Sequence, residues 1–284
     1  MSAISPTRLD DLAGRTAVIS GGSRGIGLEI AKRIGADGAN VTLIAKTAEP
    51  HPKLPGTIYT AAEEIESAGG TALPFVGDIR DETAVAEAVA RTVERFGGVD
   101  IVVNNASAIN LAPMAALEVK RFDLMQQINA RGTFVLTRAC LEHLRASDHA
   151  HVLTLSPPLT ADPRWLANHA AYTLSKMGMT MLTLGLAADE AEHGIAANCL
   201  WPRTIIGTAA VQNLLGGDQA MARSRTPAIY ADAAYEILRR DPRECTGRAF
   251  IDDEALAEAG ITDLSGYSEP GAELQLDIFV DDWG

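Results

Sequence analysis

The fold of this chain is decided by one stretch near the N-terminus, Thr16-Ala17-Val18-Ile19-Ser20-Gly21-Gly22-Ser23-Arg24-Gly25-Ile26-Gly27. Its first five residues are typical of a buried strand, and the pattern from about 26 to 37 predicts a helix. Glycines between a strand and a helix let the backbone turn tightly and approach a pyrophosphate at the positive end of the helix. The spacing Gly-x-x-x-Gly-x-Gly therefore indicates a dinucleotide site, with a plain strand–helix turn as the alternative.

Short apolar runs alternate with longer helical patterns along the rest of the chain. We expect further strands at 40–45, 72–76, 99–104, 151–156, 196–201 and 248–252. We expect helices at 60–68, 82–96, 114–144 (one long helix or two abutting ones) and 170–192. Such alternation implies a parallel sheet with helices on both faces, and ligands bind at the carboxyl ends of its strands. The predicted fold class is α/β, a single Rossmann-type doubly wound sheet of about seven strands.

Length and composition are those of one globular domain. The chain has 284 residues, 47% of them hydrophobic, and a net charge of −13 at pH 7. We expect one domain over 1–284, with a core at 10–250 and a C-terminal extension at 251–284. The acidic balance argues against nucleic acid or an anionic membrane as a partner. No apolar run approaches ~18 residues, and the three cysteines form no metal spacing. We therefore predict no membrane span, no metal and a cytoplasmic location.

A tyrosine and a lysine lie four residues apart in the stretch Tyr172-Thr173-Leu174-Ser175-Lys176. On a helix these two side chains share a face. A tyrosine titrates near pH ~10, and a neighbouring positive charge favours its ionised form and lowers its pKa. Tyr172 is therefore expected to exchange a proton with a substrate oxygen. Together with the glycine turn, the pair predicts carbonyl reduction or alcohol oxidation with a nicotinamide cofactor.

The end of the second predicted strand bears on the choice of cofactor. Enzymes that use NAD often place an acidic residue there for the ribose hydroxyls, whereas this chain has Ala45-Lys46-Thr47. Lys46, with Arg24 from the glycine turn, is expected to neutralise a 2′-phosphate, which favours NADP(H). A solvated lysine is the alternative. Asp78, after the third strand, is expected either to hydrogen-bond the adenine amino group or to cap the next helix.

These motifs together resemble the short-chain dehydrogenase/reductase family. The resemblance rests on the glycine turn, Asn104-Asn105-Ala106, Asn129 and the Tyr172–Lys176 pair. It implies that Tyr172 is the proton donor in reduction and the base in oxidation. Lys176 would lower its pKa and hold the nicotinamide ribose, and Asn129 would continue a proton relay through water, or simply bond backbone groups. The cofactor-binding residues it implies are Gly21, Ser23, Arg24, Gly25, Ile26, Gly27, Lys46, Asp78, Asn104, Lys176 and Pro202.

The stretch at 45–59 is unusual for the wider family, and together with the stretches at 155–159 and 200–204 it indicates a narrower group within that family. The likeness extends from about Leu12 to the C-terminus. Animal members of that group carry a sterol-carrier domain, which implies a lipid-like substrate such as a fatty aldehyde, ketone or acyl-CoA.

The chain also departs from the family pattern. Ser107 replaces the glycine usual after Asn-Asn-Ala. The family's catalytic serine lies closer to its tyrosine than Ser156 does here, and the following Pro157 has no donor group. Ser156 is therefore either the catalytic hydroxyl or structural, in which case another donor, or Tyr172 alone, acts on the carbonyl. Arg203 replaces the usual glycine after a proline. It either meets an anionic group or the nicotinamide amide, or is solvated.

Several segments carry further expectations. Residues 204–226 are expected to form a lid, and the acidic tail at 255–284 to cover a partner subunit's active site or to pack on its own domain. Trp165 and His169 are candidates for the pocket wall or for packing. By family likeness, the two long helices imply a homodimer or homotetramer.

The leading interpretation is an NADP(H)-dependent oxidoreductase that interconverts a carbonyl and an alcohol on a lipid-like substrate. One alternative is an enoyl-CoA-type reductase, motivated by the altered Ser156-Pro157 corner. The other is a cofactor-binding regulatory protein with little turnover, motivated by Pro157 and Arg203. A hydroxy product would indicate the carbonyl reductase, and a saturated product the enoyl-CoA-type reductase. NADPH binding without Tyr172-dependent turnover would indicate the regulatory protein.

Overall fold

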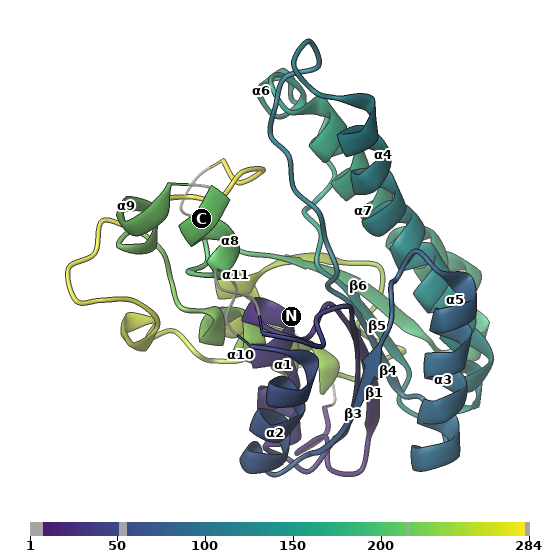
Figure 1. The fold of residues 1–284 in the computed structure, drawn as a ribbon. Coiled ribbons are helices and arrows are strands. Elements are labelled where there is room, and N and C mark those ends of the chain that lie inside the picture. Colours follow the sequence, from purple (N-terminus) through teal and green to yellow (C-terminus); the bar gives the residue numbers. More distant parts are fainter. Residues whose placement is uncertain (1–7, 51–55, 215, 282–284) are drawn as a thin grey trace.

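The structure is a computed structural model and describes residues 8–50, 56–214 and 216–281. Its centre is a seven-stranded parallel sheet in the order β3-β2-β1-β4-β5-β6-β7 (Figure 1). The strands are β1 (Thr16–Ser20), β2 (Asn40–Ala45), β3 (Thr71–Val76), β4 (Ile101–Asn104), β5 (His151–Thr154), β6 (Ala196–Trp201) and β7 (Ala249–Ile251). The predicted fold class is confirmed.

Helices cover both faces of the sheet (Figure 1). One face carries α1 (Gly25–Gly35), α2 (Ile58–Ala68), α10 (Pro227–Leu238) and α11 (Asp252–Glu258). The other carries α3 (Glu82–Phe96), α4 (Val119–Ile128), α5 (Ala130–Ala146) and α7 (Ala170–Asp189). Shorter elements are α6 (Pro163–Leu166), α8 (Ala209–Leu214), α9 (Gly217–Met221), η1 (Ala191–His193) and η2 (Ser265–Tyr267). Each face has its own buried apolar core, as expected for a doubly wound sheet.

The carboxyl ends of the strands meet along one edge of the sheet. Because every strand pair is parallel, the glycine turn after β1, Lys46 after β2 and Ser156 after β5 lie along this edge. The strand order reverses between β1 and β4, where the chain leaves β3 and returns to the other side of β1. This switch point is the usual ligand position in such sheets.

The helices differ from the expectation in two places. The stretch expected as one or two helices at 114–144 contains two, which are interrupted at Asn129 (ψ −79°). Neither α10 nor α11 was expected. Nine of the twelve residues of α10 are buried, between α1 and α11, so it lacks the one-sided apolar pattern that marks a surface helix.

Residues 51–55 of the unusual stretch, Leu215 of the expected lid and the last three residues lie outside the described part.

Candidate active site

The glycine turn is held to the end of β4 by side-chain hydrogen bonds. Asn105 Nδ2 donates to the carbonyls of Ser20 (2.8 Å) and Gly21 (3.0 Å), and Ser20 Oγ accepts from the N–H of Asn105 (3.2 Å) and Ala106 (3.1 Å). Gly21 has a left-handed φ of 71°. A Cβ at Gly27 would lie 2.5 Å from Asn105 Nδ2, so glycine is required there for this approach. Sequence reasoning missed the role of Asn105.

The outer side of the turn is open and fits a dinucleotide pyrophosphate. A Cβ at Gly25, where φ is 58°, would meet no atom nearer than Thr208 Cγ2 at 3.7 Å. Arg24 precedes α1 and gives its first turn no side-chain cap, so the leading N–H groups of α1 are left for a ligand. The buried Arg24 Nε has no hydrogen-bond partner among the described residues. Thr208, at the start of the expected lid, was not predicted.

Two cations surround Asp78 beyond β3. Arg80 Nη2 donates to Asp78 Oδ2 (2.6 Å), its Nε bonds both carboxylate oxygens, and Lys46 Nζ lies 3.5 Å from Oδ2. Hydrogen bonding from Arg80 is the main reason that the pKa of Asp78 falls to about 2. The alternative of a helix cap is wrong for Asp78, because Asp81 caps α3 by accepting from Thr83 and Ala84. Arg80 was missed, although it lies only two residues from Asp78.

The other predicted cofactor residues lie at the same edge of the sheet. Ser23 is buried in the glycine turn, Ile26 packs against the core beneath α1, and Pro202 is buried directly after β6. Asn104 Nδ2 donates to Thr137 (3.0 Å) and Thr154 (3.3 Å), which ties β4 to α5 and β5.

Tyr172 and Lys176 lie on the first turns of α7, with 4% and 3% of their surface exposed. Lys176 Nζ donates to the Leu155 carbonyl (2.8 Å) and lies 5.3 Å from the centre of the Trp201 ring. Burial lowers the pKa of Lys176 to about 7. Burial also raises the pKa of Tyr172, opposed by a hydrogen bond with the Ser107 side chain. The expectation that Lys176 lowers this pKa is not met here, because desolvation of the phenol dominates.

Asn129 joins the loop after β4 to α7. Its Oδ1 accepts from the Ala108 N–H (2.7 Å), and its Nδ2 donates to the Ala108 carbonyl (3.0 Å) and to Ser175 Oγ (2.8 Å). The side chain is fully buried. Its amide is thus engaged by a backbone segment and by the residue before Lys176.

The Ser156 hydroxyl has its partners in the protein interior. The side chain is fully buried, and its Oγ accepts from Thr180 Oγ1 (2.9 Å), which also contacts the Pro157 carbonyl (2.7 Å). A further interaction links it to the buried Cys199 thiol on β6. The hydroxyl is therefore held in the interior between α7 and β6.

Arg203 is a structural ion-pairing residue. Only 3% of it is exposed, its Nε bonds both carboxylate oxygens of Asp253 (2.9 Å each), and its Nη2 donates to Glu254. The alternative of a solvated arginine is wrong. Its carbonyl also accepts from the Asp277 N–H (2.9 Å), which connects the end of β6 to the C-terminal tail.

The tail packs on its own domain, over Tyr172. We call Gln275–Asp281 the C-terminal strap; in Figure 1 the yellow C-terminal segment returns beside α8. Trp201 Nε1 donates to the Ile278 carbonyl (2.8 Å), and Trp165 Nε1 donates to Asp281 (2.9 Å). The described part of the tail, up to Asp281, thus contacts its own domain.

Phe279 is the centre of the strap's contact. It has a left-handed φ of 69°, which is uncommon for a residue with a bulky side chain. Its ring stacks on Tyr172 at 22°, with centroids 6.4 Å apart. The remaining aromatic contacts are with Trp165 (5.9 Å), His169 (5.9 Å) and Trp201 (5.8 Å). Trp165 and His169 therefore pack against the strap, and an apolar cage adjoins the phenol.

Asp277 places a carboxyl group near the catalytic candidates. It is partly buried, and burial raises its pKa to about 7. Its charge acts on both Tyr172 and Lys176, raising the pKa of each. No pattern in the sequence marked it.

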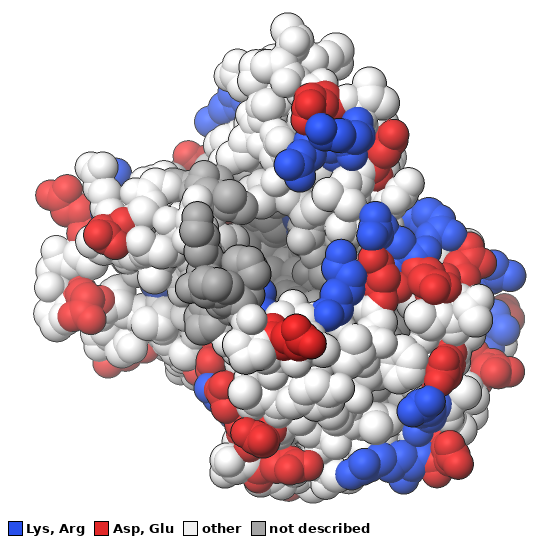
Figure 2. All heavy atoms as spheres, viewed as in Figure 1, with Lys and Arg blue, Asp and Glu red and all other residues white. Residues whose placement is uncertain are grey.

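Figure 2 shows this face of the molecule hollowed between the lobe that carries α4 and α6 and the rest of the domain, with basic and acidic side chains mixed along the rim.

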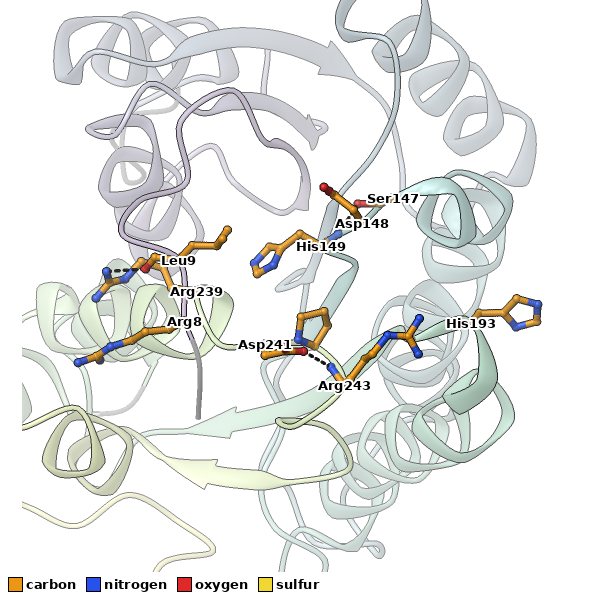
Figure 3. A pocket seen from close by; sticks show the side chains of 11 residues that line it. Arg8, Leu9, Ser147, Asp148, His149, His193, Arg239, Asp241 and Arg243 are labelled. Atoms are coloured by element: carbon orange, nitrogen blue, oxygen red, sulfur yellow. Dashed lines mark hydrogen bonds between the residues drawn. The ribbon is translucent and has the colours of Figure 1, made fainter. Parts of the chain in front are cut away.

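A separate cavity lies near the amino ends of β5 and β6, lined by Arg8, Asp148, His149, Arg243 and neighbours. In Figure 3 the side chains of Arg8, His193 and Arg243 diverge from the cavity's centre, so they do not converge on a ligand.

Within the described ranges, no helix is both long and apolar enough to span a bilayer. In the same ranges, no group of three or more His, Cys, Asp or Glu is arranged to hold a metal ion.

Known proteins share both the sequence and the fold. Hydroxysteroid dehydrogenase-like protein 2 from Xenopus tropicalis is 52% identical over 272 residues, which are 95% of this chain and 64% of the relative. The Homo sapiens protein is 49% identical over 273 residues, 96% of this chain and 65% of the relative. The chain thus spans just under two thirds of these curated relatives. The narrower likeness indicated by the three stretches at 45–59, 155–159 and 200–204 is confirmed.

Two solved structures show the same architecture. A short chain dehydrogenase from Mycobacterium thermoresistibile superposes with a TM-score of 0.91 at 59% identity, covering 95% of this chain and 96% of that one. A dehydrogenase/reductase from Sinorhizobium meliloti 1021 has a TM-score of 0.73 at 32% identity, covering 85% and 94%. Residues 15–217 match the short chain dehydrogenase family, whose members are oxidoreductases that use nicotinamide cofactors. The chain therefore belongs to the short-chain dehydrogenase/reductase family.

Proposed function

We propose that this protein is an NADP(H)-dependent oxidoreductase that interconverts a carbonyl and an alcohol on an apolar, lipid-like substrate. The observation that carries the proposal is the placement of Tyr172 and Lys176 on α7, at the sheet edge that also bears the open glycine turn. A proton donor and a dinucleotide cradle at one edge are the two requirements of this reaction.

The cofactor would be held by groups already described. The first-turn N–H groups of α1 would bind the pyrophosphate, and Lys46, joined by Arg24, would face a 2′-phosphate. Lys176 would hold the nicotinamide ribose. When bound, the nicotinamide supplies or accepts the hydride.

Burial of the site keeps a proton available on Tyr172. Burial keeps the Tyr172 phenol protonated, so it is ready to donate its proton to a carbonyl oxygen. Burial also brings the pKa of Lys176 to about 7, so this amine exchanges protons readily near neutral pH. A phenolate formed at Tyr172 would then be stabilised by the ammonium of Lys176.

The surroundings of Tyr172 favour an apolar substrate. Met125, Met177, Trp201, Ile251, Phe279 and Val280 form one buried cluster with the phenol ring. An alkyl or aromatic group beside the carbonyl would be removed from water against these side chains, at about 25 cal/mol per Å² of apolar surface.

NADPH oxidation by the wild type would test the proposal, using decanal, a medium-chain ketone, acetoacetyl-CoA and an enoyl-CoA, with products identified. An alcohol from an aldehyde or ketone supports it. A saturated acyl-CoA as the sole product would instead establish the enoyl-CoA reductase. NADPH binding with no turnover on any of these compounds would overturn carbonyl reduction on them.

The preference for NADP(H) has its own test, the variant Lys46→Ala. We expect its Kd for NADPH to rise by about tenfold while its Kd for NADH is unchanged, because only NADPH carries the 2′-phosphate. The control is Lys120→Ala, another exposed lysine paired with a carboxylate. Equal losses for NADPH and NADH in Lys46→Ala would contradict the assignment.

We also propose that the protein is a homodimer or homotetramer that associates through α5 and α7. Phe134 on α5 and Leu174, Met181 and Leu182 on α7 are large apolar side chains exposed to solvent in the isolated chain. Light scattering should give an oligomer that Met181→Asp weakens, and a monomeric wild type would contradict the proposal. We also propose a cytoplasmic location, because three buried free thiols suit a reducing compartment.

A further inference from the structure

We propose that Ser107 is the catalytic hydroxyl that polarises the substrate carbonyl, in the place left by the inward-facing Ser156. The inference rests on the proposed carbonyl chemistry and identifies a residue that the family pattern does not assign, since glycine is usual at this position. It makes the loop after β4, rather than the end of β5, the source of the second hydrogen-bond donor.

The end of β5 offers no free hydroxyl to a substrate. Ser156 is fully buried, its Oγ accepts from Thr180 Oγ1 at 2.9 Å, and its side chain also hydrogen-bonds the buried Cys199 thiol. The next two residues, Pro157 and Pro158, have neither a hydroxyl nor a backbone N–H. A second donor for the carbonyl, beside Tyr172, would therefore come from another element.

The backbone on both sides of Ser107 is fixed. On one side, the Ala106 N–H donates to Ser20 Oγ (3.1 Å), which anchors the loop to the end of β1. On the other, Asn129 bonds both the N–H and the carbonyl of Ala108, at 2.7 and 3.0 Å. Because its neighbours are tied down, Ser107 is held in position, as a preorganised donor requires.

Ser107 adjoins the phenol and is also open to solvent. Its side chain is a hydrogen-bonding partner of Tyr172. Ser107 is exposed, whereas Tyr172 is buried, so Ser107 is the member of the pair that solvent reaches. A carbonyl oxygen that enters from solvent would meet the Ser107 and Tyr172 hydroxyls together.

The resulting step is balanced. A hydride from NADPH forms a C–H bond at the carbonyl carbon, the C=O π electrons move to the oxygen, and Tyr172 transfers its proton to that oxygen, giving an alcohol and NADP⁺. The resulting phenolate then regains a proton by way of Lys176 or solvent. Ser107 keeps its proton throughout and stabilises the charge that develops on the oxygen. Removing one such donor costs about 10²–10³-fold in kcat.

The test compares Ser107→Ala with Ser156→Ala in decanal reduction. We expect Ser107→Ala to lower kcat by about 10²-fold or more with the Kd for NADPH unchanged, and Ser107→Thr to restore most of the rate. Ser156→Ala should keep kcat within a few-fold and lower thermal stability instead, because it breaks an interior hydrogen bond. The reverse ranking of the two alanine variants would overturn the inference.

The double variant Ser107→Ala/Tyr172→Phe separates a catalytic from a positioning role. If Ser107 contacts the carbonyl, the residual rate of Tyr172→Phe falls further in the double variant; if Ser107 only orients Tyr172, the two rates are equal and the inference fails. An active wild type that is insensitive to Ser107→Ala would overturn this inference alone, whereas an inactive wild type would overturn the proposed function as well.

Discussion

The cofactor side of the site, built on β1, β2 and β4, differs from the substrate side, built on β5, β6 and the C-terminal strap. On the cofactor side, the glycine turn between β1 and α1 supplies the cradle within one short stretch, and a single residue from the end of β4, Asn105, holds it in place. On the substrate side, the phenol is enclosed by residues from α6, α7, β6 and the strap, which are distant in sequence. Local motifs thus determine where the dinucleotide binds, whereas tertiary packing determines what the reactive tyrosine meets.

The largest effect is expected on the cofactor side, from Gly27→Ala. Its Cβ would lie 2.5 Å from Asn105 Nδ2, whose hydrogen bonds hold the glycine turn. We expect NADPH binding to weaken by about 10²-fold, and the free energy of unfolding to fall by about 1–3 kcal/mol from overpacking. Titration of NADPH fluorescence and urea unfolding would measure both.

The control for this prediction is Gly98→Ala, because a Cβ at Gly98 would meet no atom within 4 Å. Wild-type affinity in Gly27→Ala would show that the turn does not form the cradle.

On the substrate side, Phe279→Ala is expected to affect stability but not cofactor affinity. Loss of the ring leaves a cavity among Trp165, Tyr172 and Trp201, and should cost about 2–3 kcal/mol of stability. Acrylamide should then quench the fluorescence of Trp165 and Trp201 more strongly, because the strap no longer covers them. The comparison is made in a Trp283→Phe background, so that these two are the only tryptophans in the protein. NADPH affinity should not change, which would separate the two sides of the site.

Leu159→Ala, which removes an apolar side chain that is already half exposed, is the matched control. If quenching is the same in Phe279→Ala and in the wild type, the strap does not shield the tryptophans.

The smallest effect is expected from Asp277→Asn, and it depends on pH. The pKa of Asp277 is raised from 3.8 to about 7, so between these pH values the native state binds more protons than the unfolded state. The free energy of unfolding of the wild type therefore falls as the pH rises from 3.8 to about 7, and above about 7 the full loss is reached. The uncharged variant avoids this loss and should be more stable there by about 1–2 kcal/mol, a value discounted for partial exposure.

Urea unfolding below the ordinary pKa of 3.8 and above the raised value of about 7 would check this difference. A gap between variant and wild type that is equal at both pH values would contradict burial of the carboxyl group.

Much of the fold follows from the sequence because its strands and main helices carry local patterns. Each of the seven strands overlaps its predicted range, and the glycine turn and the Tyr172–Lys176 pair lie at the predicted edge. By contrast, α10 was missed because a helix buried on most sides has no apolar stripe.

The substrate side was less predictable because its contacts join distant residues. Ser156 faces inward because Thr180, twenty-four residues later, accommodates its hydroxyl. Arg203 is neutralised by acidic residues fifty positions away, at the start of α11. The direction of the Tyr172 pKa shift depends on burial, which the four-residue spacing to Lys176 does not report.

The central claim, that this chain reduces carbonyls with Tyr172 as the proton donor, is tested most directly by single-turnover reduction of decanal. NADPH-loaded wild type and Tyr172→Phe would be compared by the loss of NADPH absorbance, with the product identified. We predict equal NADPH binding, decanol from the wild type, and a rate about 10³-fold lower in the variant. Reduction at the same rate in both proteins would contradict the claim.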